Sequence, residues 1–201
     1  MKRRFIGILA AFLAIQPITA KCEPVISPST LTEWKQAANE GFASAQYNLG
    51  VLYYHGMSVT QDYSEAAKWF RMAANQGHGN AQFNLGTAYF KGQGVTQDYA
   101  EAARLYRLAG VNGIVEAQYQ LGLMYIKALG VGQDAVEAVK WFRLAAGQGH
   151  GNAQFNLGVS YEYGVGVPLD KRIAKEWYGK ACSGGVQKGC EFSRKLGAEG
   201  Y

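Results

Sequence analysis

The side chains best suited to chemistry are few in this sequence, and none stands in a catalytic or metal-binding spacing. The three histidines are His55, His78 and His150, and no His-x-x-x-His, Cys-x-x-Cys or His-x-Glu pattern is present, so zinc binding is not predicted. No serine precedes a lysine by three positions, and Gly-x-Ser-x-Gly is absent, so no familiar acyl-transfer nucleophile is present. We therefore predict that the protein is not an enzyme and that it has no catalytic residue, no metal and no cofactor.

Two glycine-rich stretches resemble phosphate-binding loops only superficially. "GQGV" at 92–95 and "GVGV" at 164–167 each lie between two expected helices, and the strand that precedes such a loop in nucleotide-binding proteins is missing. The glycines are better explained by the elements that surround them. His78 and His150 also lie in turns between expected helices, and we interpret them as polar turn residues.

Those elements repeat along the chain. "AQYNLG", "AQFNLG", "AQYQLG" and "AQFNLG" begin at Ala45, Ala81, Ala117 and Ala153, a constant step of 36 residues, and "QGHGNAQFNLG" occurs twice, at 76–86 and 148–158. Columns of tyrosine, aspartate and glycine keep the same step. A register this strict is typical of a solenoid, in which each unit buries its apolar face only by stacking on its neighbours.

Each unit is predicted to be a pair of helices. In the first helix Ala45, Leu49 and Tyr53 share a face, and a glycine follows the last turn. The second helix opens at an aspartate with a glutamate three residues on, as in Asp62 and Glu65, a spacing that favours a reciprocal cap. Its apolar stripe includes Trp69, and the equivalent positions hold Leu105, Trp141 and Trp177.

The pattern A-x-x-x-L-G-x-x-Y, followed by a Gly-rich loop, Asp and A-x-x-W-F/Y-x-x-A-A-x-x-G, resembles the Sel-one-like repeat (SLR) family, which is related to tetratricopeptide repeats. The resemblance covers residues 30–197 and implies an all-α solenoid, a right-handed superhelix of helix-turn-helix repeats. Four full repeats are expected near 41–76, 77–112, 113–148 and 149–184, with partial units at both ends. The sequence departs from the family pattern at Ser58, Ala128 and Ile173.

The N-terminus has the composition of a secretory signal peptide. "MKRR" precedes an apolar run of eleven residues, and Ile18 and Ala20 suit a cleavage site after residue 20. The run is too short to span a bilayer, which takes about 20 residues. Without the signal, 17 basic residues face 15 acidic ones, a net charge of +2 instead of +5, so nucleic-acid binding is not predicted. A short segment, 21–29, precedes the repeats. We expect a periplasmic or secreted bacterial protein that does not insert into the membrane after cleavage.

Three cysteines remain in the mature chain. Cys182 and Cys190 lie either side of a glycine turn, and the resemblance to the Helicobacter cysteine-rich members of the SLR family implies a disulfide between them. An oxidising compartment favours a bridge over metal binding, although two buried free thiols would also fit the sequence. Cys22 is left as a free or intermolecular thiol, because Lys21 is a poor residue to precede a lipidated cysteine.

The first helices carry a second, outward face once the packed stripe is subtracted. Amides recur on this face at one position, and His, Lys, Lys and Tyr follow at another; in the SLR family the first helices line the concave surface. Amide side chains can donate to and accept from a peptide backbone, which suits an extended partner. The candidate partner-binding residues are Asn48, His55, Asn84, Lys91, Gln120, Lys127, Asn156 and Tyr163.

Taken with the resemblance, these features predict an exported, non-enzymatic scaffold that binds another protein, one with an acidic or extended segment. Family members of this kind act as adaptors, as host-interaction factors or as immunity proteins against periplasmic phospholipase toxins. The alternative is a cell-wall or β-lactam-binding enzyme with weak β-lactamase-like activity, as in the cysteine-rich relatives.

Overall fold

The computed structural model describes residues 28–201, and this part of the chain consists of ten α-helices and no strand. The predicted signal peptide and Cys22 lie outside the described residues. None of the helices in the described part is long and apolar enough to cross a bilayer. The helices are α1 (Pro28–Asn39), α2 (Ala43–His55), α3 (Tyr63–Asn75), α4 (Gly79–Lys91), α5 (Tyr99–Val111), α6 (Val115–Lys127), α7 (Ala135–Gly147), α8 (Gly151–Tyr163), α9 (Lys171–Ser183) and α10 (Gln187–Ala198).

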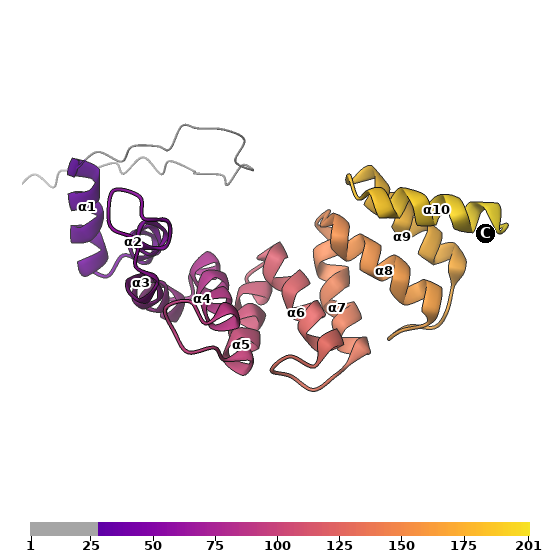
Figure 1. The fold of residues 1–201 in the computed structure, drawn as a ribbon, viewed down its shortest axis with the longest axis horizontal. Helices are drawn as coiled ribbons and strands as arrows, with labels where there is room; N and C mark the ends of the chain where they lie inside the picture. The colour runs from indigo at the N-terminus through magenta and orange to yellow at the C-terminus, as the bar shows by residue number, and fades with distance from the viewer. Residues whose placement is uncertain (1–27) are drawn as a thin grey trace, which may run out of the picture.

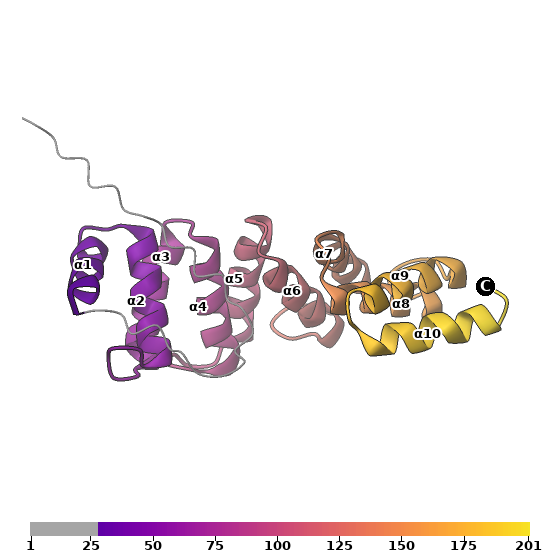
Figure 2. The ribbon, with the colours of Figure 1, turned by 90° about the horizontal axis from the view of Figure 1, so that it is seen from above.

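The predicted all-α solenoid is confirmed. The even-numbered helices are the first helices of the repeats and the odd-numbered ones the second helices, so the described array starts on a second helix and ends on a first. Each helix packs extensively on its neighbours in sequence and hardly at all on more distant helices. The result is an arc with α1 and α10 at its ends (Figure 1). The array also twists along its length: α2 and α4 run vertically in Figure 2, whereas α10 runs nearly horizontally.

The second helices start where their aspartates predict, but the glutamate acts differently from the prediction. The Asp62 carboxylate accepts hydrogen bonds from the backbone N–H groups of Ser64 and Glu65, both at 2.9 Å. The Asp62 N–H donates to the Tyr53 carbonyl, so Glu65 has no free N–H to reach. Glu65 instead pairs with Lys68 at 2.8 Å. The reciprocal cap that we predicted is therefore wrong, and only its aspartate half exists. Asp98, Asp134 and Asp170 cap in the same way.

The first helices end in the left-handed conformation, which glycine adopts without steric cost. Gly92 ends α4 with φ +69° and Gly164 ends α8 with the same value. At the third repeat Ala128 adopts this conformation, with φ +54°. Ser58, which replaces a loop glycine of the other repeats, also has a positive φ of +58°. The departures from the family pattern at Ser58 and Ala128 therefore leave the loop shape unchanged. Both residues carry a side chain in a backbone region that favours glycine.

The core is built from columns that the repeat predicts. In α2, α4, α6 and α8 a glycine recurs at the 36-residue step, and it faces an aromatic ring of the following second helix. A Cβ built on Gly122 would lie 2.5 Å from the Phe142 ring. The ring therefore rests directly on the backbone of its neighbour. The four pairs are Gly50 with Phe70, Gly86 with Tyr106, Gly122 with Phe142 and Gly158 with Tyr178.

Candidate protein-binding surface

All eight predicted partner-binding residues lie on the first helices, at two equivalent positions of each repeat. They form an amide row (Asn48, Asn84, Gln120, Asn156) and an end row (His55, Lys91, Lys127, Tyr163). The amide row is half-buried and the end row is exposed. In the N-terminal half of the array, α2 and α4 lie on the inner side of the arc and α3 and α5 on the outer side (Figure 1). The structure thus places the eight residues in two continuous rows along one set of helices.

Much of the amide row is occupied by contacts between repeats. Asn84 is hydrogen bonded to the hydroxyl of Tyr47, one repeat earlier, and Asn156 is bonded in the same way to Tyr119. Burial raises the pKa of both tyrosines, and the asparagine hydrogen bonds act in the opposite direction. Each amide retains further donors and acceptors. These asparagines therefore join neighbouring first helices and have only part of their hydrogen-bonding capacity free.

The third repeat adds a polar network to this row. Gln120 donates to Glu116 at 2.8 Å, and Glu116 also lies 3.1 Å from Nε2 of His150. The His150 hydrogen bond is the main cause that lowers the pKa of Glu116. Nδ1 of His150 accepts from the N–H of Ala153, so Nε2 must carry the proton that it donates to Glu116. Both ring nitrogens are therefore used in holding the start of α8.

The end row presents positive charge in adjacent repeats. Lys91 and Lys127 lie in the last turns of α4 and α6 and are exposed. Within residues 28–201 neither lysine forms an ion pair. Their ammonium groups are free to attract carboxylates, and that attraction would weaken as salt is added. The end row is the part of the predicted site whose chemistry is least used by the fold itself.

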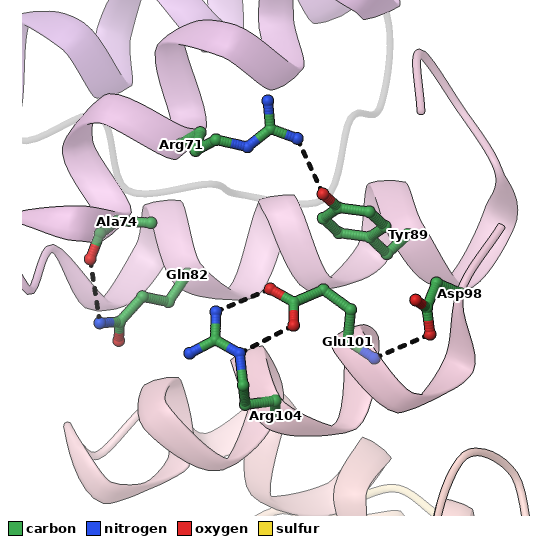
Figure 3. Close-up of polar contacts among 7 residues, drawn as sticks. All are labelled: Arg71, Ala74, Gln82, Tyr89, Asp98, Glu101 and Arg104. Carbon is green, nitrogen blue, oxygen red and sulfur yellow. Dashed lines mark hydrogen bonds and ion pairs between the residues drawn. The ribbon is translucent and has the colours of Figure 1, made fainter. Parts of the chain in front are cut away.

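Two ladders of hydrogen bonds that were not predicted from the sequence join the repeats. Arg71 on α3 donates to the hydroxyl of Tyr89 on α4 at 2.8 Å, and Gln82 donates to the Ala74 carbonyl at 3.3 Å (Figure 3). The arginine ladder recurs in Arg107–Tyr125 and Arg143–Tyr161, each pair 18 residues apart. The repeat columns contained this signal, because an arginine precedes each of these tyrosines by half a period. Figure 3 also shows the bidentate pair of Arg104 with Glu101 and the Asp98 cap.

Among the described residues no group of three or more His, Cys, Asp or Glu side chains could hold a metal ion. The predicted disulfide is present, joining Cys182 on α9 to Cys190 on α10 with their Cα atoms 4.6 Å apart. Gly189 stands where the other repeats have an alanine at the 36-residue step. The glycine lets α10 approach α9 closely, since a Cβ there would lie 2.9 Å from the Cys182 nitrogen.

The repeats match the family model described as Sel1 repeat at residues 43–78, 79–110, 115–150 and 151–186, which together make up most of the chain. The chain belongs to the Sel1 (Sel-one-like) repeat family. No curated protein matches its sequence.

A protective antigen of uropathogenic Escherichia coli with an SLR fold is 45% identical, with a TM-score of 0.77, over 80% of this chain and 34% of that chain. This Sel1 chain therefore spans about a third of the antigen. A Sel1 repeat protein from Oxalobacter formigenes is 30% identical, with a TM-score of 0.79, over 82% of this chain and 68% of that one. Helicobacter pylori cysteine rich protein B is 19% identical with a TM-score of 0.52, over 65% of this chain and 94% of that chain, a likeness of fold alone.

Proposed function

We propose that this Sel1 repeat protein is an exported, non-enzymatic scaffold that binds another protein through the end row and the amide row of its first helices. The observation that carries the proposal is the pair of exposed, unpaired lysines, Lys91 and Lys127, at equivalent positions of adjacent repeats, beside amides with remaining hydrogen-bonding capacity. Such a surface suits an extended segment with carboxylates. The Cys182–Cys190 disulfide supports the export part, since disulfides persist in oxidising compartments.

The family that the sequence resembles offers three forms of this role: an adaptor in envelope assembly, a host-interaction factor and an immunity protein that blocks a periplasmic phospholipase toxin. The identity of the partner separates them. Affinity capture with residues 21–201 followed by mass spectrometry would name the partner. Hydrolysis of nitrocefin by the purified protein would contradict the non-enzymatic part of the proposal.

To test this surface, its two unpaired lysines are removed, and the loss of binding is compared with the loss on removing two cations elsewhere. We expect the K91A/K127A variant to bind the captured partner about tenfold more weakly, and a further N84A/Q120A change to weaken it again, because the amides retain part of their capacity. The matched control is K188A/R194A, which removes two exposed cations from α10. The control should bind like the wild-type protein. Equal losses in K91A/K127A and K188A/R194A would show that binding follows overall charge and not this surface.

A further inference from the structure

The outer face of the second helices carries its own repeated pattern, which the proposed function does not use. Three exposed positions recur at the 36-residue step in α3, α5 and α7: two cations and a large apolar side chain. We call this the outer second-helix face, and its residues are Lys68, Arg71, Met72, Arg104, Arg107, Leu108, Lys140, Arg143 and Leu144. The fourth repeat breaks the pattern with Glu176, Gly179 and Lys180, so the face spans three repeats.

The apolar members of this face are exposed to an extent that packing does not explain. Met72, Leu108 and Leu144 are 44%, 40% and 51% exposed, and Val111, one turn beyond Leu108, is 76% exposed. A groove of about 320 Å³ lies between α3 and α5, and Leu108 and Arg104 help to line it. Isolated exposed apolar residues are ordinary in proteins, but a row at equivalent positions beside a groove is typical of an interaction surface.

The cations of the face divide into neutralised and free charges. Lys68, Arg104 and Lys140 each pair with a glutamate three residues earlier in the same helix. Arg71, Arg107 and Arg143 instead donate to the neutral tyrosine hydroxyls of the following repeat, and none of them meets a carboxylate within residues 28–201. The guanidinium carbon of Arg71 also lies 5.9 Å from the centre of the Tyr89 ring.

This arrangement holds three positively charged side chains in place and uses few of their hydrogen-bond donors. A guanidinium has five N–H donors, so a single bond to a tyrosine hydroxyl leaves most of them available to a carboxylate. The tyrosine fixes the side chain before any partner arrives, so less rotamer entropy is lost on binding. Arg107 and Arg143 repeat the geometry of Arg71, with the same 5.9 Å separation from their tyrosine rings.

We propose that the outer second-helix face is a second docking surface, for an acidic polypeptide segment that carries apolar side chains. Its carboxylates would bind the row of Arg71, Arg107 and Arg143, and its apolar side chains would cover Met72, Leu108 and Leu144. A polypeptide fits better than an anionic bilayer because the array curves and twists, so three repeats do not present one plane (Figures 1 and 2). A flexible segment can follow that path.

The segment needs to be long enough to reach two repeats. Successive second helices are separated by one first helix, and packed helices lie 8–10 Å apart, so the step along the face is at most about 20 Å. An extended chain covers this distance in about six residues and a helix in about thirteen. The probe is therefore a fluorescein-labelled random copolymer of glutamate and leucine, long enough to cross three repeats, because it samples many spacings.

Fluorescence anisotropy with residues 21–201 tests the surface. We expect saturable binding of the glutamate–leucine copolymer, weaker binding of polyglutamate of equal length and no binding of a lysine–leucine copolymer. R71Q/R107Q/R143Q and, separately, M72S/L108S/L144S should each weaken binding about tenfold. Y89F/Y125F/Y161F keeps the charges but removes the hydroxyls that position them, and it should weaken binding by about threefold. Thermal melts verify that each variant is folded.

The matched control is R172Q/K188Q/R194Q, which removes three exposed cations that lie outside this face and outside the end row and amide row. It should bind the copolymer within about twofold of the wild-type protein. Equal weakening in the control, equal binding of polyglutamate, or binding only to phosphatidylglycerol vesicles would overturn the proposal. The proposed function fails separately, because it is judged with the captured partner and with the first-helix variants.

Discussion

At the scale of single residues, two histidines act as helix caps through a ring nitrogen. Nδ1 of His78 accepts the N–H of Ala81 at 3.2 Å, and Nδ1 of His150 accepts that of Ala153 at the same distance. Each ring also contacts a tyrosine of the preceding first helix, His78 with Tyr47 at 4.6 Å between ring centres. Only the neutral ring can accept at Nδ1, so protonation removes the cap and places a positive charge at the positive end of a helix.

This geometry predicts a pH dependence that His78 carries. Burial lowers the pKa of His78, so its stabilising contribution is full above the unfolded pKa of about 6.5 and is lost as the pH falls through the lower folded pKa. We expect the free energy of unfolding to fall by about 1 kcal/mol through loss of this cap, and H78N to remove that loss, because asparagine caps without titrating. Urea unfolding from about pH 7.5 to about pH 5 measures it.

The control variant for this prediction is H55N, because His55 is exposed in the last turn of α2 and does not stand at a helix N-cap. An H78N protein that loses as much stability on acidification as the wild type would contradict the cap mechanism.

At the scale of elements, a glutamine in each first helix donates to a carbonyl eight residues earlier, near the end of the second helix. Gln46, Gln82, Gln118 and Gln154 make this bond, and the last repeat replaces it by the Cys182–Cys190 disulfide, also eight residues apart. The disulfide thus takes the place of a hydrogen bond at the junction of α9 and α10, the last helix pair in the described part of the chain. Closing so short a loop is worth about 2–3 kcal/mol.

The side-chain oxygen of each of these glutamines, except that of Gln154, also accepts a hydrogen bond. Gln76, Asn112 and Gln148, at the ends of the second helices, donate to Oε1 of Gln46, Gln82 and Gln118. The equivalent residue in the fourth repeat is Gly184, and Oε1 of Gln154 is buried without a hydrogen-bond partner in the described part of the chain. A buried acceptor of this kind costs about 1–3 kcal/mol.

The missing bond predicts a stabilising substitution, Gly184→Gln. Gly184 has φ −81°, which any residue adopts, and a Cβ there lies 3.5–3.6 Å from its nearest neighbours, an ordinary contact. We expect G184Q to raise the free energy of unfolding by about 1–2 kcal/mol, measured by urea unfolding. G184A gives only the backbone part of the gain, about 0.4–1 kcal/mol. If G184Q is no more stable than G184A, the glutamine does not reach Oε1.

The elements were predictable because packing columns repeat, whereas the polar contacts depend on how repeats approach each other. The 36-residue step placed the helix pairs and the aspartate caps, and the resemblance to the cysteine-rich members of the family implied the disulfide. It did not show that the Asp62 N–H is taken by the Tyr53 carbonyl, which excludes the reciprocal cap with Glu65. Nor did it show that Asn84 reaches Tyr47, because that contact depends on the superhelical approach of two first helices.

At the scale of the whole molecule, the repeats alternate in pairs. The aromatic column of the first helices reads Tyr47, Phe83, Tyr119 and Phe155, and the turn column that follows reads His78, Ile114, His150 and Val186. A tyrosine is therefore followed by a histidine whose ring contacts it and an asparagine that bonds its hydroxyl. A phenylalanine is followed by an aliphatic residue. The chemical unit is two repeats long, which accounts for "QGHGNAQFNLG" recurring 72 residues apart.

This two-repeat unit predicts how the solenoid can be lengthened. Inserting a second copy of residues 79–150 after His150 creates a His150–Gly79 junction that reads like the native sequence on both sides, and Tyr119 meets Asn84 as it natively meets Asn156. Because each helix packs almost only on its sequence neighbours, stability adds up over interfaces. We expect the melting temperature to rise by at least ~2–4 °C, equivalent to ~1 kcal/mol.

The control for the two-repeat insertion is a one-repeat insertion, in which a second copy of residues 79–114 follows Ile114. There the half-buried amide of the inserted Asn84 faces Phe83, which has no hydroxyl, and an unmade hydrogen bond costs about 1–3 kcal/mol. The one-repeat insertion should therefore gain less stability per added repeat than the two-repeat insertion, or lose stability outright. Thermal melts and urea unfolding of the two proteins measure the difference. Equal gains per repeat would mean that the alternation of tyrosine and phenylalanine has no energetic role and that a single 36-residue repeat is the physical unit of this solenoid.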